Sequence, residues 1–75
     1  MEDDLIRLIA QSLVDSPDDV NVRRKETSGS VIVHLKVASG DMGRVIGKQG
    51  RIANAMRTLL RVVAPTDKRV ILEID

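Results

Sequence analysis

The chain has 75 residues, enough for one small domain with a single modest core and no second domain. Apolar residues make up 43% of it, but there is no aromatic residue, no cysteine and one histidine, so base-stacking platforms, disulfides and thiolate or multi-histidine metal sites are excluded. The net charge of +1 conceals a division, because residues 1–19 carry −5 and residues 20–75 carry +6.

A helix is predicted over residues 2–14. It opens on three consecutive acidic residues beginning at Glu2, which suit the positive end of a helix dipole, and apolar residues then recur at helical spacing. Ser16-Pro17 ends the helix, because a residue before proline avoids the α region. The acidic start is the opposite of a signal peptide's basic region, and no apolar run could span a membrane. We therefore expect a cytoplasmic protein without membrane insertion.

A β-hairpin is predicted next. Residues 20–26 begin as an alternating strand and become polar, and residues 27–30 have the composition of a hairpin loop. Residues 31–37 alternate most clearly, with three valines and Leu35 on one face. His34 lies on the other face, which predicts a surface residue, and the sequence offers no nucleophile motif that would give it a catalytic role.

Two helices and a last strand complete the chain. Ser39 is a candidate cap for a short helix over residues 41–46. A longer helix is predicted over residues 51–63, and Pro65 stops it because proline cannot continue a helix. Residues 69–74 alternate again and predict a strand.

The order of these elements predicts the fold class. It is α-β-β-α-α-β within one domain spanning residues 1–75. A hairpin makes the first two strands antiparallel, whereas the crossover through two helices suits a parallel, right-handed connection to the third. The expected architecture is therefore an α+β domain in which a three-stranded mixed sheet has helices packed on one face.

The apolar residues of the predicted helix 51–63 cover an unusually wide arc. They fill roughly 200° of the helical wheel, whereas a core-facing stripe needs only about 100° or somewhat more. Three interpretations account for the additional apolar surface of this helix. It contacts a second subunit, it lines a ligand groove, or other helices of the domain pack around it. The candidate residues for a partner interface are Ala55, Leu59 and Val62.

Residues 40–50 carry four of the five glycines and end in Ile46-Gly47-Lys48-Gln49-Gly50. Glycine costs about 0.5–1 kcal/mol relative to alanine inside a regular element, so packing alone does not favour such a cluster. Without Cβ atoms a sugar-phosphate strand can approach the backbone, and the start of the next helix favours anions. Nearby cations strengthen this reading, which predicts a non-catalytic clamp for a single strand.

Eight residues form the candidate binding site for the strand. The cations are expected to contact phosphates, the glycines and Gln49 to admit the strand, and the isoleucines to floor a groove for bases. Arg57 and Arg61 lie further along the helix and are expected to be solvated. The site residues are Arg44, Ile46, Gly47, Lys48, Gln49, Gly50, Arg51 and Ile52.

The stretch Val45-Ile46-Gly47-Lys48-Gln49-Gly50 resembles the V-I-G-x-x-G signature of KH domains, and the element order resembles their type II arrangement. The run from Asp41 to Ala53, in a chain of this length, resembles the KhpA family of small bacterial RNA-binding proteins. The resemblance implies binding of single-stranded RNA, and a homodimer or a heterodimer with a KhpB-like partner. It also implies a role as an RNA chaperone or post-transcriptional regulator, linked to cell shape and cell wall biogenesis.

Other readings of the glycine segment fit less well. A P-loop needs four residues between its glycines and a Ser/Thr after its lysine, whereas Gly43 and Gly47 enclose three and Gln49 follows Lys48. No apolar span surrounds Gly43-x-x-x-Gly47 to make it a membrane packing motif. We therefore expect no catalytic residue, metal or cofactor. The competing class is an interaction module that docks a partner through its wide apolar helix.

Overall fold

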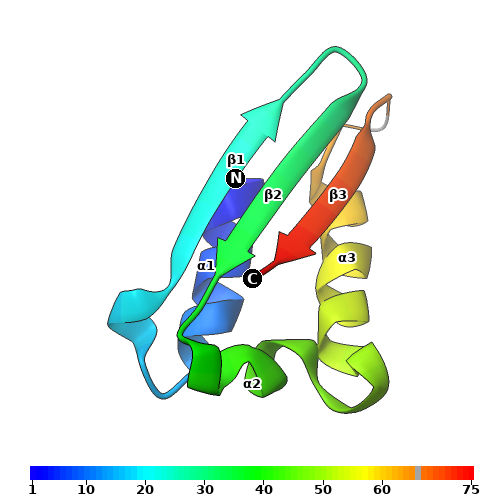
Figure 1. Cartoon of the computed structure of the whole chain (residues 1–75). Helices are drawn as coiled ribbons and strands as arrows, with labels where there is room; N and C mark the ends of the chain where they lie inside the picture. The colour runs from blue at the N-terminus through cyan, green and yellow to red at the C-terminus, as the bar shows by residue number, and fades with distance from the viewer. Residues whose placement is uncertain (66) are drawn as a thin grey trace.

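The computed structural model describes residues 1–65 and 67–75. The helices are α1 (Glu2–Leu13), α2 (Met42–Ile46) and α3 (Arg51–Val63), and the strands are β1 (Asn21–Glu26), β2 (Ser30–Lys36) and β3 (Arg69–Ile74) (Figure 1). Short 3₁₀ turns lie at Pro17–Asp19, Ser39–Asp41 and Lys48–Gly50. The predicted α-β-β-α-α-β order is confirmed.

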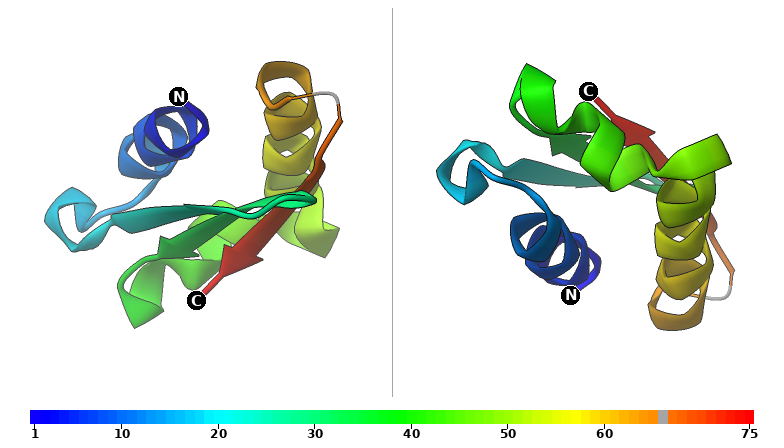
Figure 2. Two further views of the ribbon diagram at one scale, coloured as in Figure 1. Left: turned by 90° about the horizontal axis from the view of Figure 1, so that it is seen from above. Right: turned by 90° about the horizontal axis from the view of Figure 1, so that it is seen from below.

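The three strands form one mixed sheet in the order β1-β2-β3. β1 pairs antiparallel with β2, so that Arg23 lies opposite His34, and β2 pairs parallel with β3, so that Val33 lies beside Leu72. Figure 2 shows α1 and α3 on one side of the sheet, while Figure 1 places α2 beyond the end of the strands. The predicted α+β class, with a mixed sheet covered by helices on one face, is confirmed.

The core lies between the sheet and the two long helices. Val31, Val33 and Leu35 of β2 are fully buried, as are Ile6 of α1 and Leu60 of α3. Burying one such side chain stabilises the fold by about 1.5–3 kcal/mol, which explains why an aliphatic core suffices here.

No helix of the described residues covers the opposite side of the sheet, and we call this side the open face. Its side chains alternate with the buried ones along each strand, because successive residues of a strand point to opposite faces. They are Asn21, Arg23 and Lys25 of β1, Ile32, His34 and Lys36 of β2, and Arg69, Ile71 and Glu73 of β3. His34, predicted to be a surface residue, is half-buried on this face.

The prediction that Ser39 caps the short helix is wrong. Ser39 begins a 3₁₀ turn in which the Asp41 amide donates to the Ala38 carbonyl at 2.8 Å, and α2 starts only after it. No side chain caps α2. The Asp41 carboxylate, 3% exposed, instead accepts the backbone N–H groups of Asp15 and Ser16 at 3.2 and 3.1 Å. These two bonds tie the chain just after α1 to the start of α2.

Candidate nucleic-acid interface

The glycine loop between α2 and α3 has a backbone that only particular residues can adopt. Gly47 lies at φ 76° and ψ 170°, a region essentially restricted to glycine. A Cβ added to Gly47 would meet Ile52 Cγ1 at 2.7 Å and the Ile52 backbone nitrogen at 3.0 Å. Gly50 has φ 75°, but an added Cβ there would meet nothing closer than Asn54 Nδ2 at 3.8 Å. Gly47 is therefore required by space and conformation, and Gly50 by conformation alone.

Gln49 is the one non-glycine residue with positive φ in the described part of the chain, at φ 58° and ψ 25°. This left-handed conformation is uncommon for residues with a side chain, and such strain tends to concentrate at binding sites. The chain thus bends sharply between Gly47 and Gly50, and both intervening side chains are exposed. The loop projects Lys48 and Gln49 into solvent at the entrance of α3.

The start of α3 has features that suit an anion. Gly50 precedes the helix in the left-handed conformation, and no side chain caps its N-terminus. The exposed cations Lys48 and Arg51 flank this end, and neither forms an ion pair within residues 1–65 and 67–75. Since helix N-termini present donor N–H groups and positive potential, the loop and helix offer a ready position for a phosphate.

Arg44, in contrast, is engaged within the protein. Its guanidinium lies 2.9 Å from Asp15 Oδ2 and 3.2 Å from Asp41 Oδ1, and it also donates to the Gly40 carbonyl. The structure therefore places this predicted site residue in an ion-pair cluster at the base of α2. The sequence did not identify the buried partner Asp41, because the pattern of residues around an acid that precedes a short helix does not indicate that its carboxylate will be buried.

Two half-buried isoleucines lie on either side of the loop. Ile46 ends α2 and Ile52 lies in the first turn of α3, and both pack against the hydrophobic core. Further along α3, Arg57 donates to Asn54 Oδ1 at 3.1 Å and to the Leu72 carbonyl of β3 at 3.5 Å. This half-buried arginine, expected from the sequence to be solvated, joins the helix to the edge strand.

The predicted partner-interface residues Ala55, Leu59 and Val62 are all exposed on α3. Leu59 is 45% exposed and Val62 is 77% exposed, so the reading in which other helices wrap around this face is wrong. On α1, Leu8 is also exposed, at 66%. No described helix is both long and apolar enough for a membrane span, and the described residues contain no cluster of three potential metal ligands.

The chain is similar to known proteins over nearly its whole length. Residues 3–74 match the family model described as KhpA/KhpB, KH domain. A protein from Caldanaerobacter subterraneus named RNA-binding protein KhpA is 54% identical over 95% of this chain and 96% of its own length. A protein of the same name from Treponema pallidum is 51% identical over 99% of this chain and 94% of its own length.

Solved structures support the fold. A crystal structure of Era from Aquifex aeolicus superposes with a TM-score of 0.63 at 18% identity, over 97% of this chain and 29% of Era. Era in a complex that contains nucleotides of 16S ribosomal RNA superposes with a TM-score of 0.61 at 19% identity, over 97% of this chain and 28% of Era. At these identities the similarity concerns the fold alone.

Proposed function

The chain belongs to the KhpA/KhpB family of KH domains, and we propose that it binds single-stranded RNA without catalysing a reaction. The observation that carries this proposal is the loop from Gly47 to Gly50, which opens onto the uncapped N-terminus of α3. Its close approach to Ile52 leaves no space for a side chain at Gly47. A backbone bent in this way, between unpaired cations, fits a phosphodiester strand better than a simple turn requires.

Each residue of the proposed site has a physical role. Lys48 and Arg51 neutralise phosphates, and Gln49 donates or accepts hydrogen bonds at the strained position. Ile46 and Ile52 offer apolar contact to bases, since the chain has no aromatic ring for stacking. Arg44 stays in the proposed set, but RNA would have to compete for it with Asp15 and Asp41.

We further propose that the domain acts in the cytoplasm as an RNA chaperone or post-transcriptional regulator, as a homodimer or with a KhpB-like partner. The exposed apolar side chains of Leu59 and Val62 favour an association surface on α3. This surface lies further along α3, whereas the loop precedes the helix, so a single domain can bind RNA and a partner at the same time. Ala55 completes the proposed interface.

The function is tested by fluorescence anisotropy of a labelled oligouridylate at two salt concentrations. The wild-type affinity should fall as salt rises, with a log–log slope of about −0.7 for each phosphate neutralised. The variant Lys48→Asp/Gln49→Asp should lose at least about tenfold in affinity, because it places two negative charges against the phosphate path. Lys25→Asp, which reverses an exposed lysine on the open face, is the matched control and should change affinity far less.

Circular dichroism of the loop variant establishes that it remains folded. Equal binding by the wild type and the folded loop variant would refute the clamp. Absence of binding by both would refute RNA binding by the isolated domain and direct attention to the apolar face of α3.

A further inference from the structure

The cationic side chains of this domain fall into two groups. Four of the twelve Lys/Arg residues form ion pairs: Arg7 with Asp4, Arg24 with Glu2 and Glu26, Arg44 with Asp15 and Asp41, and Lys68 with Glu26. The other eight have no carboxylate partner in the described ranges. Four lie in the glycine loop or on α3, at Lys48, Arg51, Arg57 and Arg61, and four lie on the sheet, at Arg23, Lys25, Lys36 and Arg69. The proposed RNA site uses Lys48 and Arg51 and leaves this second group, the four cations on the sheet, unexplained.

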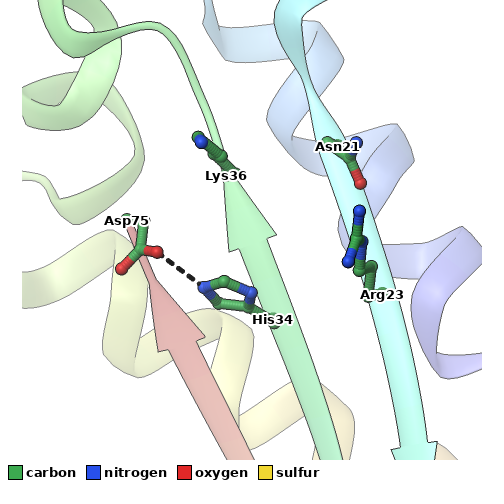
Figure 3. A pocket seen from close by; sticks show the side chains of 5 residues that line it. All are labelled: Asn21, Arg23, His34, Lys36 and Asp75. Atoms are coloured by element: carbon green, nitrogen blue, oxygen red, sulfur yellow. Dashed lines mark hydrogen bonds and ion pairs between the residues drawn. The ribbon is translucent and has the colours of Figure 1, made fainter.

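A polar hollow of about 220 Å³ lies on the open face, among this second group. Its lining comes from all three strands: Asn21 and Arg23 of β1, His34 and Lys36 of β2, and Asp75 directly after β3 (Figure 3). The sheet register sets this arrangement, because Asn21 pairs with Lys36 and Arg23 pairs with His34. The side chains of Arg23 and Lys36 therefore stand on diagonal positions of the same face.

The charges of the hollow are incompletely balanced. Asp75 is committed to His34, whose Nε2 lies 2.8 Å from Asp75 Oδ2. Arg23 and Lys36 have no carboxylate partner among the described residues, although like charges on neighbouring strands repel each other. An anion bound between them would relieve that repulsion.

The donors identify the chemical class of that anion. An arginine fork, a lysine ammonium and the Asn21 amide together match the several oxygens of a phosphate group better than a single carboxylate. The hollow is lined by no apolar side chain, and the chain has no aromatic ring on which a base could stack. The ligand group is therefore a backbone phosphate rather than a base.

We propose that the hollow of Asn21, Arg23, His34, Lys36 and Asp75 is a second phosphate contact for RNA on the open face of the sheet. It rests on the RNA binding proposed above. Figure 1 places this end of the sheet, where β2 and β3 finish, beside α2 and thus at the same end of the molecule as the glycine loop. A strand that leaves the loop and continues around α2 can reach the hollow. Asp75 opposes the contact, because its carboxylate faces the incoming phosphate.

The test compares single neutralising variants on one face. Arg23→Gln and Lys36→Gln remove charges inside the hollow, whereas Lys25→Gln removes an equivalent charge of the same face outside it. Oligouridylates of about 4 and about 16 nucleotides span the usual range of single-strand sites. For the longer RNA, each hollow variant should weaken binding about three- to tenfold and reduce the magnitude of the salt slope by about 0.7. Lys25→Gln should match the wild type, and the shorter RNA should show little difference.

Asp75→Asn adds a test in the opposite direction. It removes the repelling charge but keeps an oxygen that can accept from His34, so it should raise affinity for the longer RNA. Equal affinity of the wild type, Arg23→Gln and Lys36→Gln for the longer RNA would overturn the proposal while leaving the glycine-loop clamp intact. If every variant, including Lys48→Asp/Gln49→Asp, bound RNA as tightly as the wild type, both the hollow and the glycine-loop clamp would be overturned.

Nuclear magnetic resonance titration with inorganic phosphate distinguishes the source of the ligand. Shifts of the Asn21, Arg23, His34 and Lys36 amides with both inorganic phosphate and RNA support the proposal. Shifts with inorganic phosphate alone, without an effect of the hollow variants on RNA affinity, would identify a site for the free ion and overturn the RNA contact.

Discussion

At the residue scale, the two glycines of the loop have different physical requirements. Gly47 combines a backbone conformation essentially limited to glycine with a side-chain position already occupied by Ile52. Gly50 has positive φ and open space around it. The two glycines of the Gly-x-x-Gly signature are therefore not equivalent, and alanine substitution should destabilise the domain to different extents at Gly47 and Gly50.

We predict that Gly47→Ala destabilises the domain by more than about 2 kcal/mol, since the backbone nitrogen of Ile52 must move as well as its side chain. Gly50→Ala should cost about 1 kcal/mol, the penalty of a left-handed alanine. Urea unfolding followed by circular dichroism measures both. Gly29→Ala is the control, because an added Cβ there meets nothing within 4 Å and its φ is not positive. A larger loss for Gly50→Ala than for Gly47→Ala would contradict the steric argument.

At the element scale, the sequence predicts what depends on local pattern and misses what depends on distant partners. The alternation of residues 31–37 and the helical spacing of residues 51–63 locate β2 and α3 closely, because periodicity reports which face is buried. The glycine loop was also found, since glycine and cations leave a compositional signal. Asp41 and Arg44 show the limit: their partners Asp15 and Ser16 lie 25 to 29 positions away, and only the tertiary fold brings them together.

The exposed apolar stripe of α3 carries a prediction about association. Leu59→Lys should shift the domain toward monomer, because Leu59 is 45% exposed at the centre of the proposed interface and a charge there would be buried without a partner. Sedimentation velocity over a range of protein concentrations measures the change. Leu8→Lys is the control, since Leu8 is 66% exposed on α1 and lies outside the proposed interface.

The wild type should sediment faster as concentration rises, and Leu59→Lys should not. Concentration-independent monomer for both proteins would remove the homodimer from the proposal and leave association with a different partner. Greater disruption by Leu8→Lys would move the interface to α1.

At the scale of the whole molecule, a chain of ion pairs at the surface joins elements that also share the hydrophobic core. Glu2 of α1 accepts from Arg24 of β1 at 3.0 Å, and Arg24 also binds Glu26 at 2.6 Å. Glu26 in turn pairs with Lys68, in the connection that leads into β3. The network thus links the first helix, the hairpin and the last strand at the end of the sheet opposite α2. Its two carboxylates make the stability of the fold depend on pH.

A hydrogen bond from its own backbone N–H contributes most to lowering the pKa of Glu2, and Arg24 adds to the decrease against the opposing effect of desolvation. Lys68, followed by Arg24, lowers the pKa of Glu26. Because both pKa values are lower in the folded state, folding favours the ionised carboxylates. Their contribution to stability is therefore present above pH 4.5, the ordinary glutamate value, and is lost as the pH falls through the folded-state pKa.

We predict that Glu2→Gln and Glu26→Gln lower the Tm at pH 7 by a few degrees, and that their difference from the wild type shrinks as the pH falls below 4.5. Thermal unfolding at a series of pH values measures this. Asp18→Asn is the matched control, because this exposed acid of the 3₁₀ turn has no ion pair in the described chain and should shift the Tm little at any pH. A difference for Glu2→Gln that stays constant through the acid range would show that the side chain stabilises α1 by packing and not by charge.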